Sequence, residues 1–170
     1  MIILKYAVNL PYPEIKVESP NLDYATILSN IYAGQHSELT TILLYIFEHI
    51  SFFKTNEDYS KTLRGIAIVE MHHLQMLGEL ISLLGMKPIY MSFDQNKKEI
   101  IPWNSSFVNY NTNIKEMIDI DIQTEQNTIQ HYKYILTLIK DKYITEIIER
   151  IIKDEELHLS IFQELKKVYS

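Results

Sequence analysis

Apolar residues recur at intervals of three and four along most of this chain, a spacing typical of amphipathic helices. The pattern predicts four long helices, which cover about residues 21–54, 57–84, 113–140 and 141–168. The 170 residues include only four glycines and five prolines, so few positions oppose helix formation. The chain is therefore predicted to be an all-α protein.

Polar residues and a glycine mark the ends of these predicted helices. Residues 55–58 supply a break and a new N-cap between the first two helices. Gly85 follows the second helix as a predicted C-cap, and Pro88 prevents the helix from restarting. Asn113 and Glu116 form a capping-box pattern, which predicts the start of the third helix.

The predicted connections between the helices are short, long and short. Residues 86–112 show no sustained period and are long for a connector inside a compact domain. A segment of this length can cross a bundle of about 40 Å, the length of a helix of roughly 28 residues. Short connections pair neighbouring helices antiparallel. The sequence therefore predicts a four-helix bundle with one long crossover between helices 2 and 3.

The first twenty residues have a different pattern. They contain three prolines and a rough apolar alternation, which predicts an extended N-terminal arm over residues 1–20 and a helical bundle over residues 21–170. Such an arm can lie on its own domain as a strap, or it can pair with a neighbouring subunit. The sequence leaves both alternatives open.

Composition narrows the chemistry that this chain can perform. A hydrophobic content of 46% is enough to fill one core, and a net charge of -6 with mixed signs offers no basic face for nucleic acid. No segment reaches eighteen uncharged apolar residues, and residues 1–10 lack the features of a signal peptide, so we expect a soluble, cytoplasmic protein with no membrane partner. Because the chain has no cysteine, histidines and carboxylates are its only strong metal ligands.

One constellation of residues occurs twice along the chain. In each copy a glutamate is followed seven residues later by a tyrosine and about thirty residues later by a Glu-x-x-His motif. The first glutamates are 87 residues apart and the motifs are 85 residues apart, so the two halves repeat nearly in register. The copies consist of Glu38, Tyr45, Glu70 and His73, and of Glu125, Tyr132, Glu155 and His158.

Counting from the two short turns places these glutamates and histidines at one depth in the bundle. The first glutamate of each copy lies 16 or 17 residues before its turn, and the Glu-x-x-His residues lie 14 and 17 residues after it. Equal counts in an antiparallel pair mean equal depth, within about one turn or ~5 Å. The motifs continue into apolar helix faces, where unpartnered ionised carboxylates would each cost several kcal/mol. Two divalent cations would compensate them, bound by Glu38, Glu70, His73, Glu125, Glu155 and His158.

The neighbouring residues leave other interpretations open. Tyr45 and Tyr132 lie on the same faces as the glutamates, where a phenol can hydrogen-bond a ligand carboxylate or simply pack in the core. Asp154 and Glu156 flank Glu155 and are expected to lie on a solvated helix face. The remaining histidines fall outside the predicted ligand set and comprise His36, His49, His72 and His131.

The doubled constellation resembles the ferritin-like superfamily of di-iron and di-manganese carboxylate proteins, in which helices 1 and 3 each supply a glutamate and helices 2 and 4 each supply a Glu-x-x-His motif. The resemblance covers about residues 22–169. Residues 37–45 (SELTTILLY) are most similar to the first helix of manganese catalases and small catalase-like spore-coat proteins. The resemblance implies the same six ligands, although the manganese-catalase equivalent of Glu155 is less a ligand than a group just outside the metal shell.

The sequence also departs from members of this superfamily. Manganese catalases usually extend further at the C-terminus, which counts against full catalase activity. Rubrerythrins are expected to carry a four-cysteine electron-transfer domain, and this sequence has no cysteine. Ferritins lack the second Glu-x-x-His motif, so a symmetric redox site is expected rather than a storage shell.

The predicted ligands indicate a redox function. Carboxylate oxygens with one imidazole per metal suit Mn or Fe, and a bridged metal pair can exchange two electrons with peroxide or dioxygen. The leading hypothesis is a catalase-like or peroxidase-like oxidoreductase in which Glu155 moves protons. The alternatives are a ferroxidase or iron-handling protein, and a non-catalytic coat or assembly protein that its metals stabilise. A homo-oligomer is expected, in the cytoplasm or inside a spore or cell assembly, and the sequence does not choose between Mn and Fe.

Overall fold

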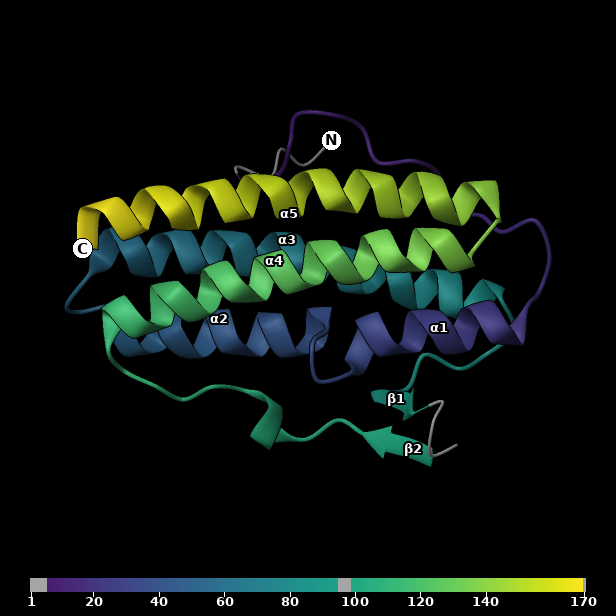
Figure 1. The fold of residues 1–170 in the computed structure, drawn as a ribbon, viewed down its shortest axis with the longest axis horizontal. Helices are drawn as coiled ribbons and strands as arrows, with labels where there is room; N and C mark the ends of the chain where they lie inside the picture. The colour runs from purple at the N-terminus through teal and green to yellow at the C-terminus, as the bar shows by residue number, and fades with distance from the viewer. Residues whose placement is uncertain (1–5, 95–98, 170) are drawn as a thin grey trace.

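The computed structural model describes residues 6–94 and 99–169. Most of these residues lie in five helices, which are α1 (Leu22–Ala33), α2 (Glu38–Phe52), α3 (Glu57–Leu83), α4 (Ile114–Leu138) and α5 (Lys142–Tyr169). Figure 1 shows α1 and α2 following one another along one side of the bundle, with α3, α4 and α5 alongside them. The described residues therefore form a bundle of four helical columns, which confirms the predicted all-α class.

The first predicted helix is interrupted at residues 34–37, so α1 and α2 replace one continuous helix over residues 21–54. Gly34 ends α1 in extended backbone, where an added Cβ would overlap the backbone oxygen of Asn30. The hydroxyls of Ser37 and Thr40 donate to the Gly34 carbonyl over 2.7 and 2.9 Å. These side-chain bonds compete with helical backbone bonds, and Ser37 then caps the new helix. As a result α2 begins at Glu38.

The other helix boundaries follow the local signals in the sequence. The side chain of Asn113 accepts hydrogen bonds from the backbone of Lys115 and Glu116 at the start of α4. Asp141 accepts from the backbone of Tyr143 at 3.0 Å at the start of α5. Gly85, with a φ of 99°, follows the last residues of α3 in the left-handed conformation that favours glycine.

The connector between α3 and α4 crosses the bundle. It contains two short antiparallel strands, β1 (Met91–Asp94) and β2 (Glu99–Pro102), followed by a 3-10 turn, η1 (Ser105–Phe107). The strands were not predicted, because four residues are too few to show a period. Figure 1 shows the connector returning to the opposite end of the bundle, so α4 runs in the same direction as α3. The predicted single long crossover is confirmed.

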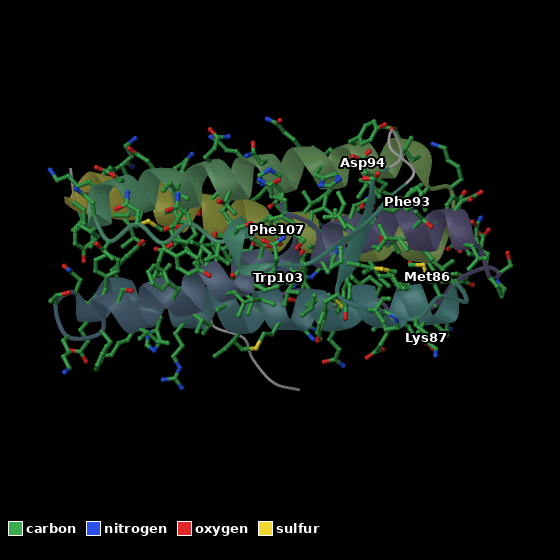
Figure 2. All side chains as sticks on the ribbon, turned by 90° about the horizontal axis from the view of Figure 1, so that it is seen from below. Met86, Lys87, Phe93, Asp94, Trp103 and Phe107 are labelled. Carbon is green, nitrogen blue, oxygen red and sulfur yellow. The ribbon has the colours of Figure 1, made fainter. Side chains whose placement is uncertain are left out.

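The connector is attached to the bundle near the middle of its path. Figure 2 looks onto this side of the bundle and labels Trp103 and Phe107 over its centre. The indole nitrogen of Trp103 donates to the hydroxyl of Thr40 at 2.9 Å, one turn from the start of α2. The crossover therefore contacts the same stretch of chain that interrupts the first helical column.

The N-terminal segment over residues 6–20 contains no helix or strand and runs along α5 as a strap. The backbone N–H of Val8 donates to Asp154 at 2.7 Å. The guanidinium of Arg150 donates to the carbonyls of Val8 and Leu10 at 2.8 and 3.1 Å. These contacts lie within one chain, residues 1–5 of the predicted arm lie outside the described residues, and pairing of the arm with a neighbouring subunit stays a prediction.

Two apolar clusters fill the bundle, one toward each end. The cluster formed by α1 with the adjoining parts of α3, α4 and α5 includes Leu28, Leu80 and Ile147. The cluster toward the other end includes Leu63 and Phe162. Polar side chains from four helices are buried between them. In the described part of the chain, none of the helices has the length and apolar character needed to cross a membrane.

Candidate metal centre

Six titratable side chains meet in the polar layer between the two apolar clusters. No more than 3% of any of these residues is exposed. They are Glu38 from α2, Glu70 and His73 from α3, Glu125 from α4, and Glu155 and His158 from α5. The structure thus brings together all six residues that the sequence singled out as ligands.

These residues form two overlapping groups, and within each group one possible ligand atom per residue lies within 4.8 Å of the others. The first group consists of Glu38, Glu70, His73 and Glu155, and the second of Glu70, Glu125, Glu155 and His158. Glu70 and Glu155 belong to both groups. Two cations held here would share these two carboxylates, and each would have one imidazole and one further glutamate of its own.

The shared glutamates differ in how they face the two imidazoles. The two carboxylate oxygens of Glu70 lie 3.0 Å from Nδ1 of His73 and 3.0 Å from Nδ1 of His158. The oxygens of Glu155 lie 2.9 Å from Nδ1 of His73 but 3.8 Å from Nδ1 of His158. Glu70 is therefore placed symmetrically between the two groups, whereas Glu155 lies closer to His73.

The hydrogen bonding of this layer is incomplete in a way that fits bound cations. Its buried atoms without a hydrogen-bond partner are Glu70 Oε1, Glu125 Oε2, Glu155 Oε1 and His158 Nδ1. Glu70 Oε1 and His158 Nδ1 are close together but are not aligned for a hydrogen bond. Buried polar atoms are normally hydrogen-bonded. Two ligands of one cation also lie close together, but both point at the cation and are therefore not aligned with each other for a hydrogen bond. The residues present therefore fit two divalent cations.

Without cations, the buried side chains of the layer shift one another's pKa values. Burial raises the pKa of Glu38 well above its usual range, and the charges of Glu70 and Glu155 raise it further. Burial and the same two carboxylates raise the pKa of Glu125. Burial opposes a charge on His158, but Glu70 and Glu155 outweigh that effect and raise its pKa to about 9. The metal-free layer must therefore hold protons on carboxyl and imidazole groups.

Two tyrosines hydrogen-bond the glutamates across the bundle. The hydroxyl of Tyr45 on α2 donates to Glu125 on α4, and the hydroxyl of Tyr132 on α4 donates to Glu38 on α2. Burial and these carboxylates raise the pKa of each phenol well above its usual range, so both remain protonated donors. Both tyrosines are also fully buried, so the two alternatives that the sequence left open occur together.

Each imidazole contacts an acceptor on its outer side. Nε2 of His73 lies 3.1 Å from Asp154, and Nε2 of His158 lies 2.9 Å from the backbone oxygen of Tyr6. A histidine that binds a metal through one nitrogen commonly donates its other N–H to a carboxylate or a carbonyl. Both histidines are thus oriented with Nδ1 toward the glutamates and Nε2 away from them.

The expectation that Asp154 lies on a solvated face is wrong, because none of its surface is exposed. It forms an ion pair with Arg150 at 2.7 Å and lies on the strap side of His73. Arg150, Asp154 and His158 follow one another at intervals of four residues, and this spacing on an apolar helix was the signal that could have identified the pair. The same expectation for Glu156 is confirmed, because Glu156 is exposed.

The other histidines lie outside both groups of possible ligands. His36 is exposed, and His72 and His131 are partly exposed. Nδ1 of His49 lies 2.7 Å from the hydroxyl of Ser60.

A second buried polar cluster was missed by the sequence analysis. The hydroxyl of Tyr59 lies 2.5 Å from Glu48 and 2.8 Å from Asp121, and all three residues are fully buried. Burial raises the pKa of Glu48 to about 7, and burial together with Glu48 raises that of Asp121. The signal was again helical spacing, because Asp121 lies four residues before Glu125.

A four-helix bundle with this arrangement of glutamates and histidines defines the ferritin-like class of dinuclear carboxylate proteins. The rubrerythrin family matches residues 33–166, and the chain belongs to this family. The matched residues run from the end of α1 into the last turn of α5.

Several known proteins are similar to this chain. A probable manganese catalase from Clostridium acetobutylicum is 24% identical over 177 aligned positions, and the alignment covers 91% of this chain and 76% of that protein. KatB, a manganese catalase from Anabaena, has 21% identity and a TM-score of 0.83 over 99% of this chain and 81% of its own. A bacterioferritin from Desulfovibrio desulfuricans has 23% identity and a TM-score of 0.72 over 85% and 78%. At these identities the structural similarity shows the fold alone.

Metal binding at this centre is expected to release protons. His158 must be neutral to bind a cation, and its pKa of about 9 means that it is protonated at neutral pH without one. Burial opposes a charge on His73, but its hydrogen bonds to Asp154, Glu155 and Glu70 outweigh this and also raise its pKa well above the usual range. Affinity for Mn²⁺ should therefore rise as the pH rises. Isothermal titration calorimetry in two buffers with different ionisation enthalpies measures the protons released at each pH. An affinity that does not change with pH, with no proton release, would contradict this charge balance.

Glu48 is expected to make stability depend on pH. Because its pKa is raised in the folded state, neutral Glu48 favours folding below its unfolded pKa of about 4.5, and this contribution is lost as the pH rises through about 7. Glu48→Gln should therefore stabilise the protein at about pH 8, by up to roughly 3 kcal/mol, and by much less at about pH 5. Urea unfolding at both pH values measures the difference. The control Glu156→Gln, at an exposed carboxylate, should change little, and a pH-independent effect of Glu48→Gln would disprove the assignment.

Proposed function

We propose that the protein binds two Mn or Fe ions in this centre and acts as an oxidoreductase on hydrogen peroxide or dioxygen, in a catalase-like or peroxidase-like manner. The observation that supports this most directly is the pair of overlapping ligand groups, which share Glu70 and Glu155 and contain one imidazole each. Carboxylate oxygens with imidazole suit Mn and Fe, and the shared carboxylates would keep two ions close enough to act on one small molecule.

The chain's own residues would hold the metals and manage protons. A bound metal pair would supply the exchange of two electrons with the oxidant. Glu70, whose oxygens lie 3.0 Å from Nδ1 of each imidazole, would be a ligand that both groups share. Glu155 is assigned as the residue that accepts and returns a substrate proton, because its Oε1 is buried without a hydrogen bond and lies in the same layer. Tyr45 and Tyr132 would hold Glu125 and Glu38 in place.

The enclosure of the centre restricts the substrate. Every proposed ligand is almost fully buried, and apolar clusters lie toward both ends of the bundle. A molecule of two oxygen atoms can reach such a site through small side-chain movements, whereas a bulky organic substrate would require the helices to separate. The similarity to a probable manganese catalase and to KatB supports peroxide as this molecule.

A ferroxidase or iron-handling role is the second candidate. It is favoured by the similarity to a bacterioferritin with a di-iron site and by the matched pair of ligand groups, each of which could hold one ferrous ion. In this case dioxygen would be the oxidant and ferrous ion the substrate. A third role, in which the metals only stabilise the bundle, would use the same ligands without turnover.

Oxygen release from peroxide tests the leading proposal. Protein loaded with Mn²⁺ or Fe²⁺ should release dioxygen from hydrogen peroxide, and Glu70→Ala should lower the rate by about 100-fold or more, because the variant lacks a ligand that both groups share. Glu156→Ala, which changes an exposed glutamate beside Glu155, should leave the rate unchanged. A Clark electrode measures the release.

The other outcomes distinguish the alternatives. The catalase-like proposal fails if neither loaded form releases dioxygen, or if Glu70→Ala matches the wild type. Consumption of dioxygen on addition of ferrous ion would then favour the ferroxidase. Unfolding by a chelator with no turnover on either oxidant would favour the structural role.

A further inference from the structure

Residues 6–12 of the strap lie against the outer side of both imidazoles of the metal centre. Its backbone reaches His158 directly and reaches His73 through Asp154. These contacts join residues more than 140 positions apart in the sequence.

The carbonyl of Tyr6 determines which nitrogen of His158 carries the proton. Nε2 lies 2.9 Å from this carbonyl, which can only accept a hydrogen bond, so Nε2 carries the hydrogen. Nδ1 of the neutral imidazole is then left with its lone pair facing Glu70 and Glu155. This is the tautomer that a cation between the glutamates requires.

A glycine on α3 allows Tyr6 to reach this position. The Tyr6 ring packs directly on Gly65, and a Cβ at residue 65 would overlap the ring. The ring and the carbonyl belong to the same residue, so the packing of the ring on Gly65 helps to hold the acceptor beside His158. Any side chain at residue 65 should therefore disturb the strap at the place where it contacts the centre.

The same segment holds Asp154 against His73. The carboxylate of Asp154 accepts from the N–H of Val8 at 2.7 Å and from the hydroxyl of Tyr12 at 2.6 Å. It also pairs with Arg150, whose guanidinium lies 4.1 Å from the centre of the Tyr12 ring. Two of the groups that orient the outer carboxylate of His73 thus come from the strap.

The repeat between the two halves of the chain explains why the strap is needed at His158. Asp154 comes directly before Glu155, but the matching position before Glu70 is Val69, whose side chain cannot accept a hydrogen bond. The two halves therefore share their ligands but not their outer acceptors. The carbonyl of Tyr6 provides for His158 the acceptor that α3 does not supply.

We propose that docking of the strap and binding of metal are coupled, with Tyr6 and Tyr12 as positioning residues for His158 and His73. Each event favours the other because both require the imidazoles in one tautomer and orientation, and such coupling is reciprocal. The inference rests on the metal centre of the proposed function, but it does not depend on which oxidant that centre uses.

Hydrogen–deuterium exchange of the full chain tests the first half of the coupling. The peptide that covers residues 7–12 should exchange more slowly with Mn²⁺ than without it, by about tenfold or more. The protected amides should include Val8, which donates to Asp154, and Leu10, which donates to the Val8 carbonyl. Exchange in this peptide that is the same with and without bound Mn²⁺ would overturn the proposal.

Gly65→Ala tests the second half. The substitution favours the helix but obstructs the Tyr6 ring, so it should weaken Mn²⁺ binding by about 10-fold to 100-fold and speed exchange in residues 7–12 while the bundle stays folded. Gly78→Ala makes the same change on α3 against Tyr32 and should alter neither quantity by more than about twofold. Competition with a fluorescent chelator measures the affinity, and circular dichroism measures folding.

A second variant protects the test against misfolding. Tyr12→Phe keeps the ring over Arg150 and removes only the hydroxyl that bonds Asp154, and it should weaken Mn²⁺ binding by several-fold. If Gly65→Ala and Tyr12→Phe both bind Mn²⁺ as the wild type does, the strap does not position the histidines. If the wild type binds no metal, the centre itself is wrong and the coupling fails with it. Binding without coupling would disprove only the role of the strap.

Discussion

Burial of four carboxylates and two imidazoles at one level of the bundle is the constraint on which the rest of the structure depends. An ionised carboxylate in such surroundings costs several kcal/mol unless a positive charge or a hydrogen-bond donor compensates it. The crossover after α3 makes α4 parallel to α3, and this brings Glu125 to the depth of Glu38 and Glu70. The two apolar clusters lie on either side of the layer and supply no charged side chain to it. Compensation must therefore come from cations, or from protons in their absence.

The two groups of the centre contain the same kinds of residue, whereas the acceptors outside them differ. Each of the two groups has its own glutamate, its own imidazole and a tyrosine that reaches across from the opposite helix. Outside this shell, His73 contacts the Asp154 carboxylate and His158 contacts the Tyr6 carbonyl. A charged and a neutral acceptor tune the basicity of an imidazole differently, so two ions of the same element would not be equivalent.

The sequence predicted the centre better than its surroundings because the centre depends on helical spacing alone. Matching counts from two tight turns were enough to bring Glu38, Glu70 and Glu155 to one level. The break at Gly34 could not be predicted this way, since a glycine within an apolar pattern is compatible with an unbroken helix. Its cause is a pair of hydroxyl bonds to the Gly34 carbonyl, which become visible only in the folded chain.

Long-range contacts explain the other differences. Charged residues usually face solvent, and Asp154 was expected to do the same. It is buried because the strap and Arg150 surround it. The pairing of Glu48 with Asp121 through Tyr59 likewise joins three helices. Helical periodicity indicates which residues face the core, but it does not indicate which of the inward-facing polar residues contact each other.

The central claim is that one bundle holds two metal ions between shared glutamates. Anomalous diffraction at the manganese edge from crystals grown with Mn²⁺ tests it most directly. Two peaks are predicted, about 3.5–4 Å apart, each beside one imidazole Nδ1, with Glu70 between them. A single peak, or peaks only at surface carboxylates with the polar layer empty, would contradict the account.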